Sequence, residues 1–99
     1  MGGIVLSGQL ICRDALDVEV VRQYLPRHIE LTLAEPGCVS FTVVPTSDER
    51  VWQVDERFVD EAAFEVHQRR VAASEWGHAT AGIERDYIIG GRGEPEPRI

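Results

Sequence analysis

Four short segments of this chain have the apolar content and patterning of strands, most clearly the alternating residues 38–44, and apolar residues recur at helical spacing along two longer segments. The patterning predicts strands, in which successive side chains point to opposite faces, at residues 4–12, 38–44, 50–58 and 80–89. Helical spacing predicts a helix over residues 16–34 and a second from the capping residue Asp60 to about Ala73. Residues 74–79 are expected to add a helical turn that Gly77 ends.

The first predicted helix carries an apolar stripe and a proline. Its stripe consists of Leu16, Val20, Tyr24, His28 and Leu31, with Val21, Leu25 and Ile29 beside it. Asp14 or Asp17 can cap its start. Pro26 removes one helical hydrogen bond, so we expect either a kink there or two shorter helices.

The order strand–helix–strand–strand–helix–strand predicts an α+β, ferredoxin-like domain over residues 1–90, with an antiparallel sheet and both helices on one face. Residues 91–99 are rich in Gly and Pro and are expected to form a flexible tail. The residues expected to face the helices include Val39, Phe41, Val43, Trp52, Val54, Glu56, Phe58, Ile83, Arg85, Tyr87 and Ile89. The open face would show Cys38, Ser40, Thr42, Val44, Val51 and Gln53. Such a mixed surface predicts a homodimer formed through this face.

Composition and charge narrow the classes of partner. The net charge of −7 and the pI of about 4.8 argue against nucleic-acid binding, because phosphate backbones repel an acidic chain. The apolar runs are too short to span a membrane, and the first residues lack the features of an export signal. We therefore expect a cytoplasmic protein whose two cysteines are reduced thiols.

Two motifs, EPGCVSF at residues 35–41 and DERFVDEAAFEVH at residues 55–67, resemble the antibiotic biosynthesis monooxygenase superfamily. The resemblance covers roughly residues 4–89 and implies a dimeric α+β barrel. Gly37 and Cys38 match the family's helix-to-strand turn, and Glu56 matches its common acidic residue before the second helix. Phe64 and His67 match the aromatic-x-x-His pattern of that helix.

The superfamily includes cofactor-free monooxygenases of phenols and quinols, haem-degrading enzymes and members of unknown role. Cofactor-free members use an Asn and a Trp near the substrate, and haem degraders use an Asn, Trp and His set. This chain contains no Asn, and His67 stands where haem degraders keep their Trp. Haem degradation is therefore disfavoured, and quinol-type oxygenation lacks one expected group.

The candidate catalytic residues are His67 as base, Glu56 as its orienting partner and His28 as a polarising group, a role that Arg85 could also fill. The candidate substrate-binding residues are Trp52, Phe41, Phe64, Trp76, Arg85 and Tyr87. Four of them have a structural alternative: His28 as a hydrogen-bonded core histidine, Glu56 as a partner of Arg85 or of the neighbours of Arg57, and Trp52 and Phe41 as core. Arg69 and Arg70 are expected on a solvated face.

The favoured interpretation is a cofactor-independent monooxygenase acting on an aromatic or quinol-type small molecule. A non-catalytic ligand-binding or stress-associated protein and a proton-transfer enzyme of the isomerase type are the alternatives. We expect no cofactor. A metal site built from His28, His67, His78 and Glu56 lacks short ligand spacing and is not expected.

Overall fold

The computed structural model describes residues 3–91, and its elements follow the predicted order. They are β1 (Ile4–Ile11), α1 (Ala15–Leu33), β2 (Cys38–Pro45), β3 (Val51–Phe58), α2 (Glu61–Ala72), α3 (Glu75–Ala79) and β4 (Glu84–Gly90). The predicted α+β, ferredoxin-like fold is confirmed. From residue 92 on, the expected tail lies outside the described residues.

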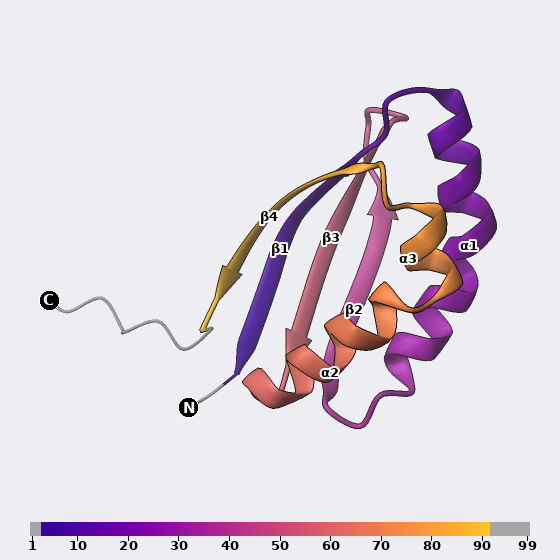
Figure 1. Cartoon of the computed structure of the whole chain (residues 1–99). Helices are drawn as coiled ribbons and strands as arrows, with labels where there is room; N and C mark the ends of the chain where they lie inside the picture. The colour runs from indigo at the N-terminus through magenta and orange to yellow at the C-terminus, as the bar shows by residue number, and fades with distance from the viewer. Residues whose placement is uncertain (1–2, 92–99) are drawn as a thin grey trace, which may run out of the picture.

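The four strands form one antiparallel sheet in the order β2-β3-β1-β4. All three helices lie on the same face of this sheet, so the opposite face is bare in the described part of the chain (Figure 1). The core between sheet and helices is built from aliphatic and aromatic side chains, among them Leu10, Val21, Val54 and Phe58. None of the described helices is long and apolar enough to cross a membrane.

Helix α1 begins as predicted but turns a slightly different face to the core. Asp14 caps it by accepting a hydrogen bond from the Asp17 backbone N–H. Leu16, expected on the buried stripe, is 75% exposed. Val21, Leu25 and His28 are buried as predicted, and Asp17, Val18 and Thr32 are buried with them. Asp17 can be buried because its carboxylate accepts bonds from the backbone and guanidinium of Arg13, which sets the phase of the helix.

Pro26 does not divide α1, so the expectation of two shorter helices is wrong. The helix runs continuously over 19 residues, and Pro26 lies on its exposed side. One missing N–H is tolerated there because solvent can reach the affected turn.

A bulge at the start of β2 reverses two of the predicted side-chain directions. Cys38 pairs with Phe58 and Ser40 with Arg57, so Val39 is an extra residue without an opposite partner. Because Phe58 faces the core, Cys38 also turns inward and packs against it. Val39 is 56% exposed. The predictions that Cys38 lies on the open face and Val39 on the covered face are therefore wrong.

The segment after α2 is also longer and more helical than predicted. Asp60 caps α2 as expected, accepting from the Ala63 N–H. Helix α3 continues past Gly77 to Ala79, and β4 begins only at Glu84. A Cβ at Gly77 would collide with the Val71 carbonyl, so glycine here allows α3 to fold back closely onto the end of α2.

Candidate functional site

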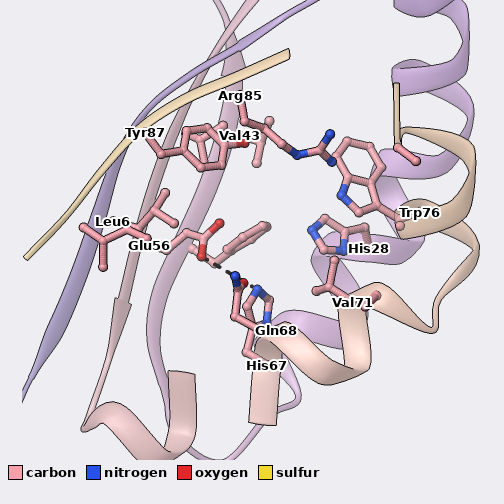
Figure 2. A pocket seen from close by; sticks show the side chains of 16 residues that line it. Leu6, His28, Val43, Glu56, His67, Gln68, Val71, Trp76, Arg85 and Tyr87 are labelled. Carbon is pink, nitrogen blue, oxygen red and sulfur yellow. Dashed lines mark ion pairs between the residues drawn. The ribbon is translucent and has the colours of Figure 1, made fainter. Parts of the chain in front are cut away.

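A cavity of about 380 Å³ lies between the covered face of the sheet and the α2–α3 segment. Figure 2 shows Leu6, Glu56 and Tyr87 on its sheet side, with His28, Val71 and Trp76 on its helical side. Its volume falls in the range of small-molecule sites. Seven of the predicted site residues line it: His28, Phe41, Glu56, His67, Trp76, Arg85 and Tyr87.

Two of the predicted substrate-binding residues, Trp52 and Phe64, do not line this cavity. Trp52 is 7% exposed and belongs to the core. Phe64 is fully buried and packs against Phe58 with their ring centroids 5.6 Å apart. Both side chains point inward, Trp52 from its strand and Phe64 from its helix. At their positions the sheet and the helices are in direct contact, so no space for a ligand remains.

His67 lies between two carboxylates. Its Nδ1 is 3.0 Å from one Glu35 carboxylate oxygen and 3.1 Å from the other, while its Nε2 is 3.7 Å from Glu56 Oε1. Burial lowers the pKa of His67, and the Glu35 hydrogen bond opposes this shift in part. A neutral imidazole that donates from Nδ1 to Glu35 presents its Nε2 lone pair toward Glu56.

Behind His67, a polar network holds Glu35 in place. Arg70 Nε donates to Glu35 Oε2 at 2.6 Å, and Arg70 Nη2 donates to Thr32 Oγ1 at 2.9 Å. The prediction that Arg70 lies on a solvated face is therefore wrong. Glu35 accepts hydrogen bonds from both His67 and Arg70, and its contact with Nδ1 restrains the orientation of the imidazole ring.

Glu35 was missed in the sequence because it lies in the turn that ends α1. A signal was nevertheless present: residues 28, 32 and 35 share one helical face, so Glu35 continues the line of His28 and Thr32. Arg70 similarly follows His67 by three residues on α2. Neither the spacing of residues 28, 32 and 35 nor that of residues 67 and 70 shows by itself that these faces of α1 and α2 meet.

Glu56 is the ionisable group of β3 that faces the cavity. Its side chain is 8% exposed, and its Oε1 has no hydrogen-bond partner among the described residues. Burial raises the pKa of Glu56 to about 7, Glu35 adds to the rise, and Arg85 opposes it. Near neutral pH this carboxyl group exists in both protonation states, which suits proton transfer.

Arg85 is held by the turn before β4. Its Nη1 donates to the backbone oxygens of Thr80 and Ile83 at 2.7 and 2.9 Å, and its Nη2 donates to Thr80 Oγ1 at 2.7 Å. These three bonds hold the positively charged guanidinium at the cavity wall.

His28 and Trp76 form one wall of the cavity. Their rings are stacked with centroids 4.6 Å apart and an interplanar angle of 5°, and Phe41 meets His28 edge-on at 5.2 Å. Burial lowers the pKa of His28 to about 3, with His67 and two arginines adding to the effect. The ring is therefore neutral at physiological pH.

Tyr87 covers the sheet side of the cavity because its neighbour on β1 is a glycine. Gly8 pairs with Tyr87, and a Cβ on Gly8 would collide with the Tyr87 backbone and ring. Burial raises the pKa of Tyr87 to about 12, so its phenol keeps its proton. It can donate a hydrogen bond to an oxygen in the cavity.

The cavity thus combines aromatic walls with a proton-accepting carboxyl group, a buried imidazole and a fixed guanidinium. Over residues 3–91, no group of three or more His, Cys, Asp or Glu side chains is arranged to hold a metal ion. The arrangement can bind a flat molecule and move a proton to or from it.

Comparisons with known proteins agree with this fold. A family model described as antibiotic biosynthesis monooxygenase matches residues 17–79, more than half of the chain. No curated protein matches the chain in sequence.

Several solved structures share the fold at low sequence identity. A proposed antibiotic biosynthesis monooxygenase from Nitrosomonas europaea superposes with a TM-score of 0.76 at 16% identity, covering 96% of this chain and 95% of that one. MupZ from Pseudomonas fluorescens gives 0.72 at 17% identity, covering 90% and 68%. Rv0793 from Mycobacterium tuberculosis gives 0.70 at 18% identity, covering 89% and 92%. At these identities the likeness concerns the fold alone.

Proposed function

We propose, since the chain belongs to the antibiotic biosynthesis monooxygenase family, that it is a cofactor-independent monooxygenase of a flat phenolic or quinol-type molecule. The observation that carries this proposal is the line of Glu35, His67 and Glu56 ending at an aromatic-walled cavity. A proton-accepting pair at one end of such a cavity suits a substrate that reacts with oxygen after it loses a proton.

In this reaction, the Glu56–His67 pair removes the acidic proton of the bound substrate, and Glu35 keeps the imidazole oriented. The electron-rich anion then reacts with O₂ to give a peroxide on a ring carbon. Loss of water from the peroxide converts a ring CH₂ group into C=O. One oxygen atom stays in the product and the other leaves as water, so the substrate itself supplies all four electrons.

Other cavity residues stabilise the charge that develops. Arg85 holds a fixed positive charge near the cavity, and Tyr87 keeps a phenolic proton that can be donated to a substrate oxygen. His28 takes part as a neutral ring rather than as a cation. Phe41 and Trp76 pack against the flat face of the substrate.

The test is oxygen consumption against a panel of anthrone-type phenols and quinols. We expect His67→Gln to lower the rate by about 10²–10⁴-fold, the usual contribution of a general base. His78→Gln is the matched control, because His78 is exposed on α3 and does not line the cavity. Equal loss in both variants, or none in His67→Gln, would show that the base is elsewhere. No uptake by the wild-type protein across the panel would favour a ligand-binding role.

A second candidate function is proton transfer without oxygen. It is favoured by Glu56, because its buried Oε1 has no hydrogen-bond partner within residues 3–91. Its pKa of about 7 also suits a base that returns its proton to another carbon. The assay is solvent-deuterium exchange into carbonyl compounds. Exchange that Glu56→Gln abolishes, without oxygen uptake, would replace the oxygenase proposal.

We further propose that a second copy of this chain covers the open face of the sheet. The exposed apolar side chains Val5, Val44 and Ile88 lie on that face, at 38%, 48% and 78% exposure, among polar neighbours. Burying them against a symmetric copy would remove apolar surface from water.

A further inference from the structure

A second cavity of about 260 Å³ lies on the far side of the His28–Trp76 wall, between α1 and the α2–α3 junction. His28 and Trp76 line both cavities, so their stacked rings separate the two. None of the residues invoked in the oxygenase reaction lines this second space except these two wall rings.

The second cavity differs from the first in its charge. Two guanidinium groups line it, from Arg27 on α1 and Arg70 on α2, against the single carboxylate of Glu75. Arg27 is bound to Glu30 at 3.0 Å, but this pair is exposed, with 68% and 69% of the two side chains accessible. Solvent screens such a pair, so Arg27 is free to turn toward a ligand at little cost.

The hydrogen bonds of Arg70 also favour an anion in the second cavity. Its Nε and Nη2 atoms are used by Glu35 and Thr32, while its Nη1 is buried and has no hydrogen-bond partner among the described residues. A buried donor without a partner is costly, and a guanidinium pairs best with a carboxylate or phosphate oxygen. Arg70 lines this cavity, and a small rotation of its guanidinium would bring the buried Nη1 within reach of an anion held there.

The remaining wall is aromatic and apolar, formed by Tyr24, Leu31 and the Trp76 indole. A ring fits against such a wall, and a volume of about 260 Å³ suits a single ring rather than a fused system. We propose that this cavity is a second binding site, which takes a small aromatic carboxylate with its ring on Trp76 and its carboxylate toward Arg27 and Arg70. The site does not depend on the proposed oxygenase activity.

Benzoate is the probe, and benzamide is its uncharged control of equal shape. Binding is followed by NMR through the shift of the Trp76 indole N–H, with the Trp52 indole in the core as internal reference. We expect saturable binding of benzoate and binding of benzamide that is about tenfold weaker or more, because the amide lacks the charge that pairs with guanidinium.

Two substitutions in the second cavity and one in the first locate the site. Leu31→Trp fills the second cavity and Arg27→Gln removes an exposed charge, and each should weaken benzoate about tenfold. Ile89→Trp narrows only the first cavity and should leave benzoate binding unchanged. Arg27→Gln keeps the test decisive if Leu31→Trp fails to fold. Equal binding of benzoate and benzamide, loss of binding in Ile89→Trp alone, or no saturation at about 10 mM benzoate would overturn the proposal.

Discussion

Replacing Glu56 by Gln should stabilise the protein at high pH and not at low pH. The folded state raises the pKa of Glu56 from its ordinary 4.5 to about 7, chiefly through burial. Between these two values the folded chain binds a proton that the unfolded chain has released. Unfolding then releases a proton, so a rise in pH favours the unfolded state.

The size of the effect follows from the shift. A difference of about 2.5 in pKa, at about 1.36 kcal/mol for each unit, gives roughly 3 kcal/mol lost by the wild-type protein between pH 4.5 and pH 7. Gln has nearly the same shape and no charge, so the variant avoids this loss. The free energy of unfolding of Glu56→Gln relative to wild type should therefore rise by about 3 kcal/mol over that range and level off above pH 7.

The assay is urea unfolding of both proteins at a series of pH values from 4 to 8. His28 and His67 have lowered pKa values, so they make stability rise with pH in the acidic range, opposite to Glu56. Both histidines are present in both proteins. The effect of His28 cancels in the difference, and that of His67 cancels apart from its coupling to Glu56 at 3.7 Å. If the amide introduced by Glu56→Gln forms better or worse hydrogen bonds than the acid, the difference in the free energy of unfolding changes by the same amount at every pH. The test is therefore how that difference changes with pH. A difference that stays constant within about 0.5 kcal/mol from pH 4.5 to 8 would refute the reasoning.

Three further predictions concern other parts of the molecule. Glu35→Gln should lower the pKa of His67 further, since the carboxylate opposes the effect of burial, and an NMR titration of the imidazole would measure this; an unchanged pKa would count against the orienting role. Gly37→Ala should cost about 1–3 kcal/mol of stability because a Cβ there would collide with α2, whereas Gly90→Ala, which meets nothing within 4 Å, should be near neutral in the same denaturant assay. Val44→Asp should weaken the proposed dimer in sedimentation, and an unchanged mass would point to another face.

Most of the fold could be predicted from the sequence because two periodicities decide it. Strand patterns placed the four strands. Asp60 marked the start of α2, and of the two candidates Asp14 and Asp17 for the start of α1 the structure selects Asp14. What failed were features that depend on a neighbour far along the chain. The bulge at Val39 is defined only by the pairing of β2 with β3, and the exposure of Leu16 depends on the burial of Asp17 against Arg13.

The candidate site was predictable in part for the same reason. Inward strand positions and helix faces identified Glu56 and His67 as neighbours, but not Glu35, which approaches from the end of α1. Trp52 and Phe64 show the opposite error: an inward-facing aromatic side chain is as compatible with close packing as with a cavity. Periodicity gives the face of an element, and only the packing of elements decides where space remains.

The network around His67 also has a consequence for how the chain folds. His67 and Glu35 are 32 residues apart in sequence, and Arg70 and Thr32 are 38 apart. Contacts of such long sequence separation close large loops and raise the contact order of the chain, which slows folding. The imidazole projects from α2 and lies between Glu35, which follows α1, and Glu56 of β3, so its surroundings are complete only when all three parts are docked together. Loss of the His67–Glu35 contact should therefore accompany any opening of α2 as well as global unfolding, which makes this side chain a reporter of how the helices dock onto the sheet.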